Sequence, residues 1–355
     1  MKIMSKRLSG KLNALACAII SLMFSTPLFA EFLSIPLPSL SAKKLAIIVN
    51  DADPISIKIA AYYQQQRKIP DQNIIHVSFK NLNNILSVEQ FKKIKQKVDA
   101  QSGSHIQAYA LTWMKPYQVG CMSITTAFAA GYDESFCAIG CKKTQQSPYY
   151  NSLSSHPFTK FKWRPTMMLA GENFEQVKKL IDRGIASDFS QPLGAAYLLE
   201  TSDKSRSVRS VFFPAIKSEF DETFNIHSLQ RDYIENKKDV MFYFTGKTHI
   251  KKIDTNTFLP GAVADHLTST GGVLFGGSQM KITEWLKAGA TGSYGTVVEP
   301  CNFVEKFPNP KVMMYYYIRG NSLIEAYWKS VAWPGQGIFI GEPLSKPFAY
   351  QHNYR

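Results

Sequence analysis

The chain has 355 residues, of which 45% are hydrophobic and 19% charged, which excludes a wholly disordered, a collagen-like and a multi-span membrane protein. The 41 Lys and Arg residues exceed the 27 Asp and Glu residues and give a net charge of +14, but no zinc-finger or RNA-binding motif accompanies this charge. We therefore expect no nucleic-acid partner, and a length of this kind allows one large α/β domain or two smaller ones.

The first thirty residues have the pattern of a cleavable secretory signal peptide. An apolar run from Ala14 to Phe24 follows a basic start, and Pro27 precedes a small residue, Ala30, at the expected cleavage point. The apolar run is too short to favour a membrane span. We expect the mature chain to begin near Glu31, in the periplasm or outside the cell, and to lack a membrane span. Cleavage removes four of the 41 basic residues, namely Lys2, Lys6, Arg7 and Lys11. The mature chain then has 37 basic and 27 acidic residues and a net charge of +10.

Beyond the signal, apolar runs that predict strands alternate with patterns that predict helices. Their order is strand 45–49, helix 56–66, strand 73–79, a lysine-rich helix that starts at the capping box Ser87–Gln90, strand 106–113, helix 173–184, strand 194–200 and strand 239–244. Near-continuous apolar strands separated by helices are typical of a mostly parallel sheet with helices on both faces. No repeat or linker interrupts the pattern, so we expect one α/β domain over residues 31–355.

The segment from about 116 to 164 breaks this alternation. Cysteine, aromatic, Gly, Ser and Pro residues crowd together there, without a periodic apolar pattern. Long irregular segments in compact proteins are usually functional loops or stapled insertions. We therefore expect an irregular, cysteine-bearing insertion in the α/β domain.

The cysteines predict disulfide bonds. Apart from Cys17 in the signal, the chain has four cysteines: Cys121, Cys137, Cys141 and Cys301. An even number in an exported protein predicts two disulfides, with three possible connectivities. We expect a local bridge between Cys137 and Cys141 and a long-range bridge between Cys121 and Cys301. A metal site and a reactive thiol at Cys301 are the alternatives, but no histidine stands at a fitting local spacing, so we expect no bound metal.

The last third of the chain carries the most distinctive motifs. They are Pro260–Ser269, Lys287–Gly295, Thr296–Asn302, Gly320–Trp328 and Ile338–Leu344. With these motifs, with Val49–Pro54 and with the cysteine-bearing segment, the chain resembles a family of uncharacterised bacterial exported proteins over nearly all of its mature length. The resemblance implies export and no particular activity.

The same region is similar to the end of gingipain-type cysteine peptidases. The shared order is a helix, Gly-Ala, a strand, Gly-x-x-x-Glu-Pro, a helix that starts with Gly-x-Ser-Leu-x-Glu-Ala, and Gly-Glu-Pro-Leu. This similarity implies a caspase-like fold, with a His-Gly pair after one strand and a catalytic cysteine after the next. Here His249 comes three residues after Gly246, and residues 271–279 contain no cysteine but end near the hydroxyl of Ser278. A Cys-His dyad requires both groups within hydrogen-bond reach, so we expect the peptidase dyad to be missing.

Other polar residues follow predicted strands, where open α/β sheets bind ligands. Asp51 and Asp53 could hold a cation or an amine, and their alternative role is to cap the next helix. Glu299 precedes Pro300 in a predicted loop and is the candidate catalytic carboxylate, with a salt bridge as its alternative role. His266 is a candidate base, with a structural hydrogen bond as its alternative role.

Two further observations complete the candidate list. On a helix the neighbouring side chains of Asp265 and His266 would point apart, so we do not expect them to pair. His249 and Ser278 are candidate binding residues. A series of glycines also occurs in the last third of the chain, at Gly289, Gly292 and Gly295. It lacks the G-x-G-x-x-G spacing of a dinucleotide-binding loop, and a strand is predicted to follow it, so we expect no nucleotide cofactor.

Three function hypotheses follow from these residues. The first is an exported protein that binds a peptide or an envelope component on a caspase-like fold without the peptidase dyad, and the missing dyad favours it. The second is a hydrolase that uses Glu299, His266 and Asp51 around the carboxyl edge of the sheet. The third is a thiol-dependent enzyme, which requires a free Cys301.

Overall fold

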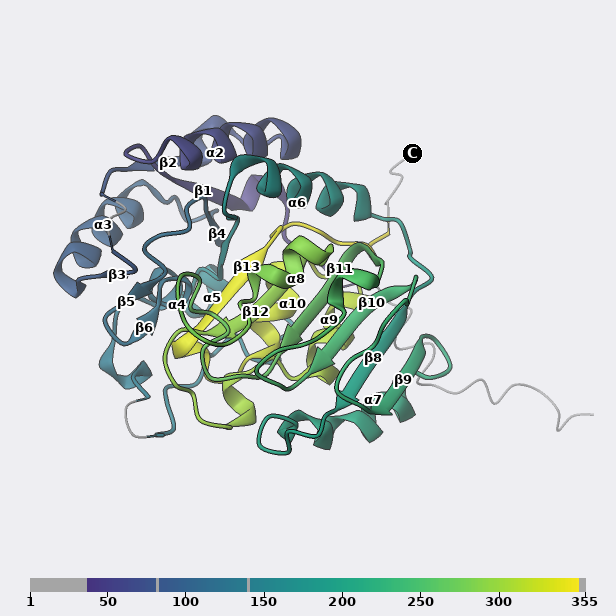
Figure 1. The fold of residues 1–355 in the computed structure, drawn as a ribbon. Helices are drawn as coiled ribbons and strands as arrows, with labels where there is room; N and C mark the ends of the chain where they lie inside the picture. Colours follow the sequence, from purple (N-terminus) through teal and green to yellow (C-terminus); the bar gives the residue numbers. More distant parts are fainter. Residues whose placement is uncertain (1–36, 81–82, 139–140, 351–355) are drawn as a thin grey trace, which may run out of the picture. The chain divides into compact units, whose positions relative to one another are not determined.

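Ten strands form one large sheet in the part of the chain that the computed structural model describes, residues 37–80, 83–138 and 141–350 (Figure 1). The predicted signal, residues 1–30, lies outside these ranges, as does the expected N-terminus at Glu31. The strand order across the sheet is β2 (Ile74–Val77), β1 (Leu45–Asn50), β4 (Ala108–Leu111), β7 (Thr166–Met168), β13 (Gly337–Gly341), β12 (Gly292–Thr296), β11 (Phe258–His266), β10 (Val240–Thr245), β8 (Ala195–Glu200) and β9 (Asn225–Gln230). A separate small sheet contains β3 (Ile85–Leu86), β5 (Gln118–Val119) and β6 (Met122–Ser123).

The large sheet is mostly parallel. Strands β2, β1, β4 and β7 run parallel to their neighbours, and so do β12, β11, β10, β8 and β9. Between these two sets β13 runs antiparallel to β12, with Gly292 opposite Gly341 and Thr296 opposite Gly337, and it contacts β7 through Ile340 and Met168. The carbonyl of Gly337, at the start of β13, accepts from the Thr125 hydroxyl near the loop after β4, whereas Glu342, after the end of β13, pairs with Arg67 at the far end of α2. The carboxyl ends of the two sets of strands therefore lie on the same edge of the sheet.

Helices cover both faces of the sheet. Glycines in β12 identify the two layers: a Cβ on Gly292 would meet Leu323 at the start of α10, whereas a Cβ on Gly295 would meet Ile282 just before α8. One layer contains α2 (Pro54–Arg67), α6 (Phe174–Ser187) and α8 (Thr283–Ala288). The other contains α3 (Val88–Gln101), α4 (Ile124–Ala130), α7 (Phe213–Phe220), α9 (Pro310–Ile318) and α10 (Leu323–Ser330). The predicted α/β class with a mostly parallel sheet is confirmed, and the caspase-like architecture stays a prediction.

The segment from 116 to 164 is less irregular than its sequence predicts. It holds β5, β6, α4 and the short helix α5 (Pro157–Phe161). The Ser123 hydroxyl caps α4 by accepting a hydrogen bond from the Thr126 amide at 3.1 Å. All but the last residue of α4 are buried, so it lacks the polar face that gives a surface helix its recognisable period.

Two of the distinctive C-terminal motifs have structural roles. Glu325 forms a capping box with Ser322 at the start of α10, and its carboxylate also accepts the Leu40 amide at 2.8 Å. Glu342 is fully buried and accepts hydrogen bonds from Arg67 of α2 and from the Tyr63 hydroxyl. These carboxylates join the C-terminal segment to the rest of the sheet, which explains the motifs without a reaction.

Candidate functional site

The strand order predicts two places where a ligand can enter the large sheet. In open α/β sheets ligands bind at carboxyl strand ends, at the point where successive connections leave in opposite directions. One such point lies between β1 and β4, because β1 connects to β2 on one side and β2 returns across β1 to β4. The other lies between β8 and β10, because β8 connects outward to β9 before the chain returns to β10.

The crevice between β8 and β10 is filled by the protein itself. Gly246 directly follows β10, and a Cβ at this position would lie 1.7 Å from the carbonyl oxygen of Arg206 in the loop after β8. The Thr201 hydroxyl from the same loop donates to the Gly246 carbonyl at 2.5 Å. Backbone thus packs on backbone at this edge, and no ligand can enter between these strand ends.

The crevice between β1 and β4 is open. It holds a pocket of about 270 Å³, which we call the switch-point pocket. Residues after β1, β4 and β7 line it together with one aromatic side chain from the loop after β11: Asp53, Ile55, Ile59, Thr112, Trp113, Met114, Lys115, Gly171, Glu172 and Phe275. Five of these side chains are apolar or aromatic, so the pocket suits an apolar group.

Hydrogen bonds at the end of β1 fix the polar side of this pocket. The Asp53 carboxylate caps α2 by accepting the Ile55 amide at 2.9 Å, which is its predicted alternative role. The Ser56 hydroxyl accepts the Asn50 amide at 2.9 Å and lies 2.7 Å from the Thr112 hydroxyl. The first turn of α2 is therefore attached to both neighbouring strand ends, and the pocket is preformed.

Charged and aromatic side chains form the rim of the switch-point pocket. The Lys115 ammonium lies 3.9 Å from the centre of the Phe275 ring, within cation–π range, and forms no ion pair with any residue that the structure describes. Glu172 forms an ion pair with Lys287 at 2.8 Å, and the hydrogen bond from Lys287 lowers the pKa of this carboxyl. Lys115 is thus the rim charge that remains available to a ligand.

The candidate carboxylates do not meet. Asp51 is exposed at the end of β1, where it pairs with His76 at 2.7 Å, and it does not line the switch-point pocket. Glu299 follows β12 and lines a different pocket, to which Asp51 does not contribute. The two carboxylates therefore share no pocket.

Glu299 lies in a different pocket, of about 370 Å³, beside a disulfide. Its carboxylate accepts the backbone amide of Cys301 at 2.7 Å, a local contact that shapes the loop. The other lining residues come from the loops after β8, β11 and β12 and from the cysteine-bearing segment: Cys141, Ser205, Arg206, Leu267, Thr268, Ser269, Cys301 and Asn302. None of the described histidines lines this pocket, so none of them is a partner of Glu299 there.

His266 occupies a buried position between the sheet and α8. Trp285 donates its indole N–H to Nδ1 of His266 at 2.9 Å, so Nε2 carries the proton and donates to the Met280 carbonyl at 3.1 Å. Asp265 points to the opposite face, where it pairs with Arg209. The two neighbours point apart as expected, but on strand β11 and not on a helix. Both ring nitrogens of His266 are used, which matches its alternative structural role.

The buried imidazole predicts a pH dependence of stability. Burial lowers the pKa of His266 to about 4, the Met280 carbonyl opposes this shift, and the charges of Arg209 and His249 add to it. The unfolded chain takes up this proton near pH 6.5 and the folded chain does not, so stability should fall by roughly 3 kcal/mol between pH 6.5 and pH 4 and level off below. Urea unfolding of the wild type and of His266→Gln over this range measures the effect. A slope that is identical in both proteins would contradict it.

The remaining candidates, His249 and Ser278, are exposed in the loops after β10 and β11. Neither lines the switch-point pocket or the pocket of Glu299. The sequence therefore identified the correct region of the pocket only through Asp53. No sequence pattern predicted a role for Lys115 or Phe275, because the two side chains come together only when the loop after β11 folds against the end of β4.

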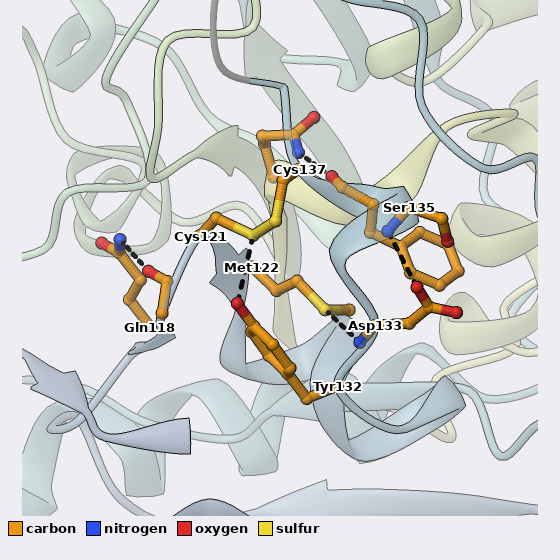
Figure 2. Close-up of a disulfide and its surroundings, with 10 residues drawn as sticks. Gln118, Cys121, Met122, Tyr132, Asp133, Ser135 and Cys137 are labelled. Carbon is orange, nitrogen blue, oxygen red and sulfur yellow. Dashed lines mark hydrogen bonds between the residues drawn. A yellow bond between two sulfur atoms is a disulfide. The ribbon is translucent and has the colours of Figure 1, made fainter. Parts of the chain in front are cut away.

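The four cysteines form two disulfides, but in a connectivity that differs from the expected one. Cys121 pairs with Cys137, with Cα atoms 5.4 Å apart (Figure 2). Cys141 pairs with Cys301, with Cα atoms 5.6 Å apart. The expected bridges, Cys137–Cys141 and Cys121–Cys301, are wrong. With Cys301 oxidised, the thiol-dependent enzyme has no nucleophile.

The chain reversal around α4 explains this connectivity. The segment leaves β6, passes through α4 and returns, and the amide of Asp133 on the returning arm donates to the Met122 sulfur at 3.4 Å (Figure 2). This contact places Cys137 beside Cys121, and the Tyr132 hydroxyl lies 3.7 Å from the Cys121 sulfur. Short spacing in the sequence did not predict the disulfide partners, because the fold of the segment brings Cys121 and Cys137 together.

Comparisons of the chain with protein-family models, with curated proteins and with solved structures gave no match.

Proposed function

We propose that this chain is an exported binding protein whose switch-point pocket holds an apolar side chain of a peptide, or a similar group of an envelope component. The observation that carries the proposal is the open pocket between β1 and β4, with its apolar lining and with Lys115 at the rim. Export is supported by the two disulfides, which persist in oxidising compartments. No helix among the described residues has the length and apolar character required to cross a membrane.

The size of the pocket supports a side chain as its occupant. Pockets for drug-sized ligands usually have about 300–1,000 Å³, and the switch-point pocket, with about 270 Å³, lies below this range. A peptide would place one large apolar side chain inside and keep its backbone at the rim. Recognition through one buried anchor and a polar rim is common in protein interfaces.

The scattered catalytic candidates favour binding over hydrolysis. General acid–base chemistry requires groups within hydrogen-bond reach of one substrate. Asp51 does not line the pocket of Glu299, and both ring nitrogens of His266 have structural partners. The second hypothesis, a hydrolase that uses these three residues, therefore has no shared site to support it.

Two isoleucines of α2 provide a matched test of this proposal. Ile55 is 40% exposed and lines the pocket, whereas Ile57 is 44% exposed and does not. A labelled pool of hexapeptides, each with one Phe, Tyr, Leu or Ile among polar residues, should bind the wild type in a fluorescence polarisation assay. Ile55→Glu should weaken this binding about tenfold, since a charge at the pocket mouth must lose water when the apolar side chain enters.

The control, Ile57→Glu, should bind as the wild type does, because its substitution has the same chemistry on the same helix. Absence of binding to any peptide of the pool, or equal losses in the two variants, would contradict the proposed pocket.

A further inference from the structure

A second pocket adjoins the switch-point pocket along the same edge of the sheet. It has a volume of about 230 Å³, lies between α6 and α8, and is called here the basic pocket. Its lining residues are Gly171, Gln176, Lys179, Leu180, Arg183, Thr283, Leu286 and Lys287. Gly171 lines both pockets, and the ion pair between Glu172 and Lys287 joins the rim of one to the lining of the other.

The charged side chains that line the basic pocket are all cations. Lys287 is neutralised by Glu172 and Glu284, at 2.8 and 3.1 Å. Lys179 is exposed and forms no ion pair with the residues that the structure covers, whereas its neighbour Lys178 pairs with Asp182. The pocket therefore keeps an excess of positive charge.

Arg183 is the most informative of these cations. One of its terminal nitrogens, Nη2, donates to the carbonyls of Leu286 and Ala290, at 2.8 and 2.6 Å. Its Nε is buried without an acceptor, and Nη1 forms no hydrogen bond within the described part of the chain. Burial lowers the pKa of Arg183 to about 10, which leaves the guanidinium charged at neutral pH. A half-buried cation that meets no carboxylate is unusual, because the burial of a charge is costly unless the charge is paired.

A second polar group in this pocket also lacks a partner. The Thr283 hydroxyl is buried at the start of α8, in a residue with 4% exposure, and forms no hydrogen bond with the residues that the structure describes. Buried polar atoms in folded proteins are nearly always paired, so two unpaired groups around one pocket indicate a missing acceptor. An anion in the pocket would supply an acceptor to these groups, because both residues line it.

From this arrangement we infer that the basic pocket is an anion subsite, and that the bound peptide carries a carboxylate close to the apolar side chain in the switch-point pocket. This inference rests on the proposed function and specifies its ligand as an acidic peptide. Arg183 and Lys179 would hold the carboxylate through charge-assisted hydrogen bonds, which are about twice as strong as neutral ones. The shared Gly171 requires the two groups to lie within a few residues of each other in the peptide.

Matched peptides and a matched pair of lysines test this inference. Labelled hexapeptides with one Phe and one Glu, one to three residues apart, are compared with peptides in which Gln replaces Glu, both with amidated C-termini. A further peptide has Gln and a free C-terminal carboxylate, which distinguishes a terminal from a side-chain anion. The wild type should bind at least one of the carboxylate peptides about tenfold more tightly than its neutral partner, and added salt should reduce this preference.

The variants Lys179→Glu and Lys178→Glu separate the subsite from general charge. Lys179→Glu should remove the preference for the carboxylate, whereas Lys178→Glu, on the same helix but outside the pocket, should keep it. Arg183→Lys should weaken the preference with little change in melting temperature, since the charge is retained.

Equal affinities for the acidic and neutral peptides, or equal losses in the two lysine variants, would overturn the anion subsite. In either case binding that still depends on Ile55 would leave the proposed function intact. Absence of any binding that depends on Ile55 would remove both.

Discussion

Replacement of both Cys141 and Cys301 with serine should lower the free energy of unfolding by about 5 kcal/mol, against about 3 kcal/mol for the same change at Cys121 and Cys137. The difference follows from loop length, because the first bridge joins residues 160 positions apart and the second joins residues 16 positions apart. A cross-link that closes a longer loop removes more conformational freedom from the unfolded chain. The longer bridge also attaches the cysteine-bearing segment to the loop after β12.

Chemical denaturation of the two double-serine variants, beside oxidised and reduced wild type, measures these contributions. The reduced wild type should be at least as unstable as the less stable variant, because it lacks both bridges. Equal losses in the two variants would show that loop length does not determine the stabilisation in this chain.

Removal of the Asp265 carboxylate should cost about 3–5 kcal/mol of stability, the usual range for one partner of a buried ion pair. The side chains of Arg209 and Asp265 are only 2% and 1% exposed, and Nη1 of Arg209 lies 2.5 Å from Oδ1 of Asp265. Arg209 also donates to the Thr245 carbonyl at 2.7 Å. Burial raises the pKa of Asp265 and the charge of Arg209 opposes this shift, so each charge depends on its partner. Asp265→Ala would leave a buried guanidinium without its counter-charge.

A double-mutant cycle with urea unfolding tests this pair. Arg209→Met combined with Asp265→Leu should be clearly more stable than Asp265→Ala alone, because the apolar pair leaves no buried charge. The control is Asp203→Ala, which breaks the partly exposed pair with Arg206 and should cost less than about 1 kcal/mol. Losses of similar size in Asp265→Ala and Asp203→Ala would contradict the buried-pair interpretation.

Local patterns predicted the individual elements well. The expected strand 45–49 is β1, and the expected helix 56–66 lies within α2, which begins two residues earlier because Asp53 caps it ahead of Pro54. The box at Ser87 caps α3, where the Ser87 hydroxyl accepts the Gln90 amide at 3.2 Å. Caps and apolar periods are encoded within a few residues, so the sequence alone is sufficient to find them.

The relation between the two halves of the sheet could not be predicted in this way. The direction in which β13 pairs with β12 depends on side-chain packing across the sheet, and no local pattern records it. That pairing places the loops after β11 and β12 on the same edge of the sheet as the pocket between β1 and β4. Phe275 reaches this pocket from the other half, so its role becomes visible only in three dimensions.

The position of the bound peptide is best measured by photo-crosslinking. A peptide that binds in an Ile55-dependent manner is prepared with benzoylphenylalanine in place of its apolar residue, irradiated with the wild-type protein, and the linked residues are identified by mass spectrometry. Crosslinks should concentrate on side chains that line the switch-point pocket, above all Ile55, Met114 and Phe275. Crosslinks in the separate pocket that Glu299 and Cys301 line would contradict the assignment of the switch-point pocket as the binding site.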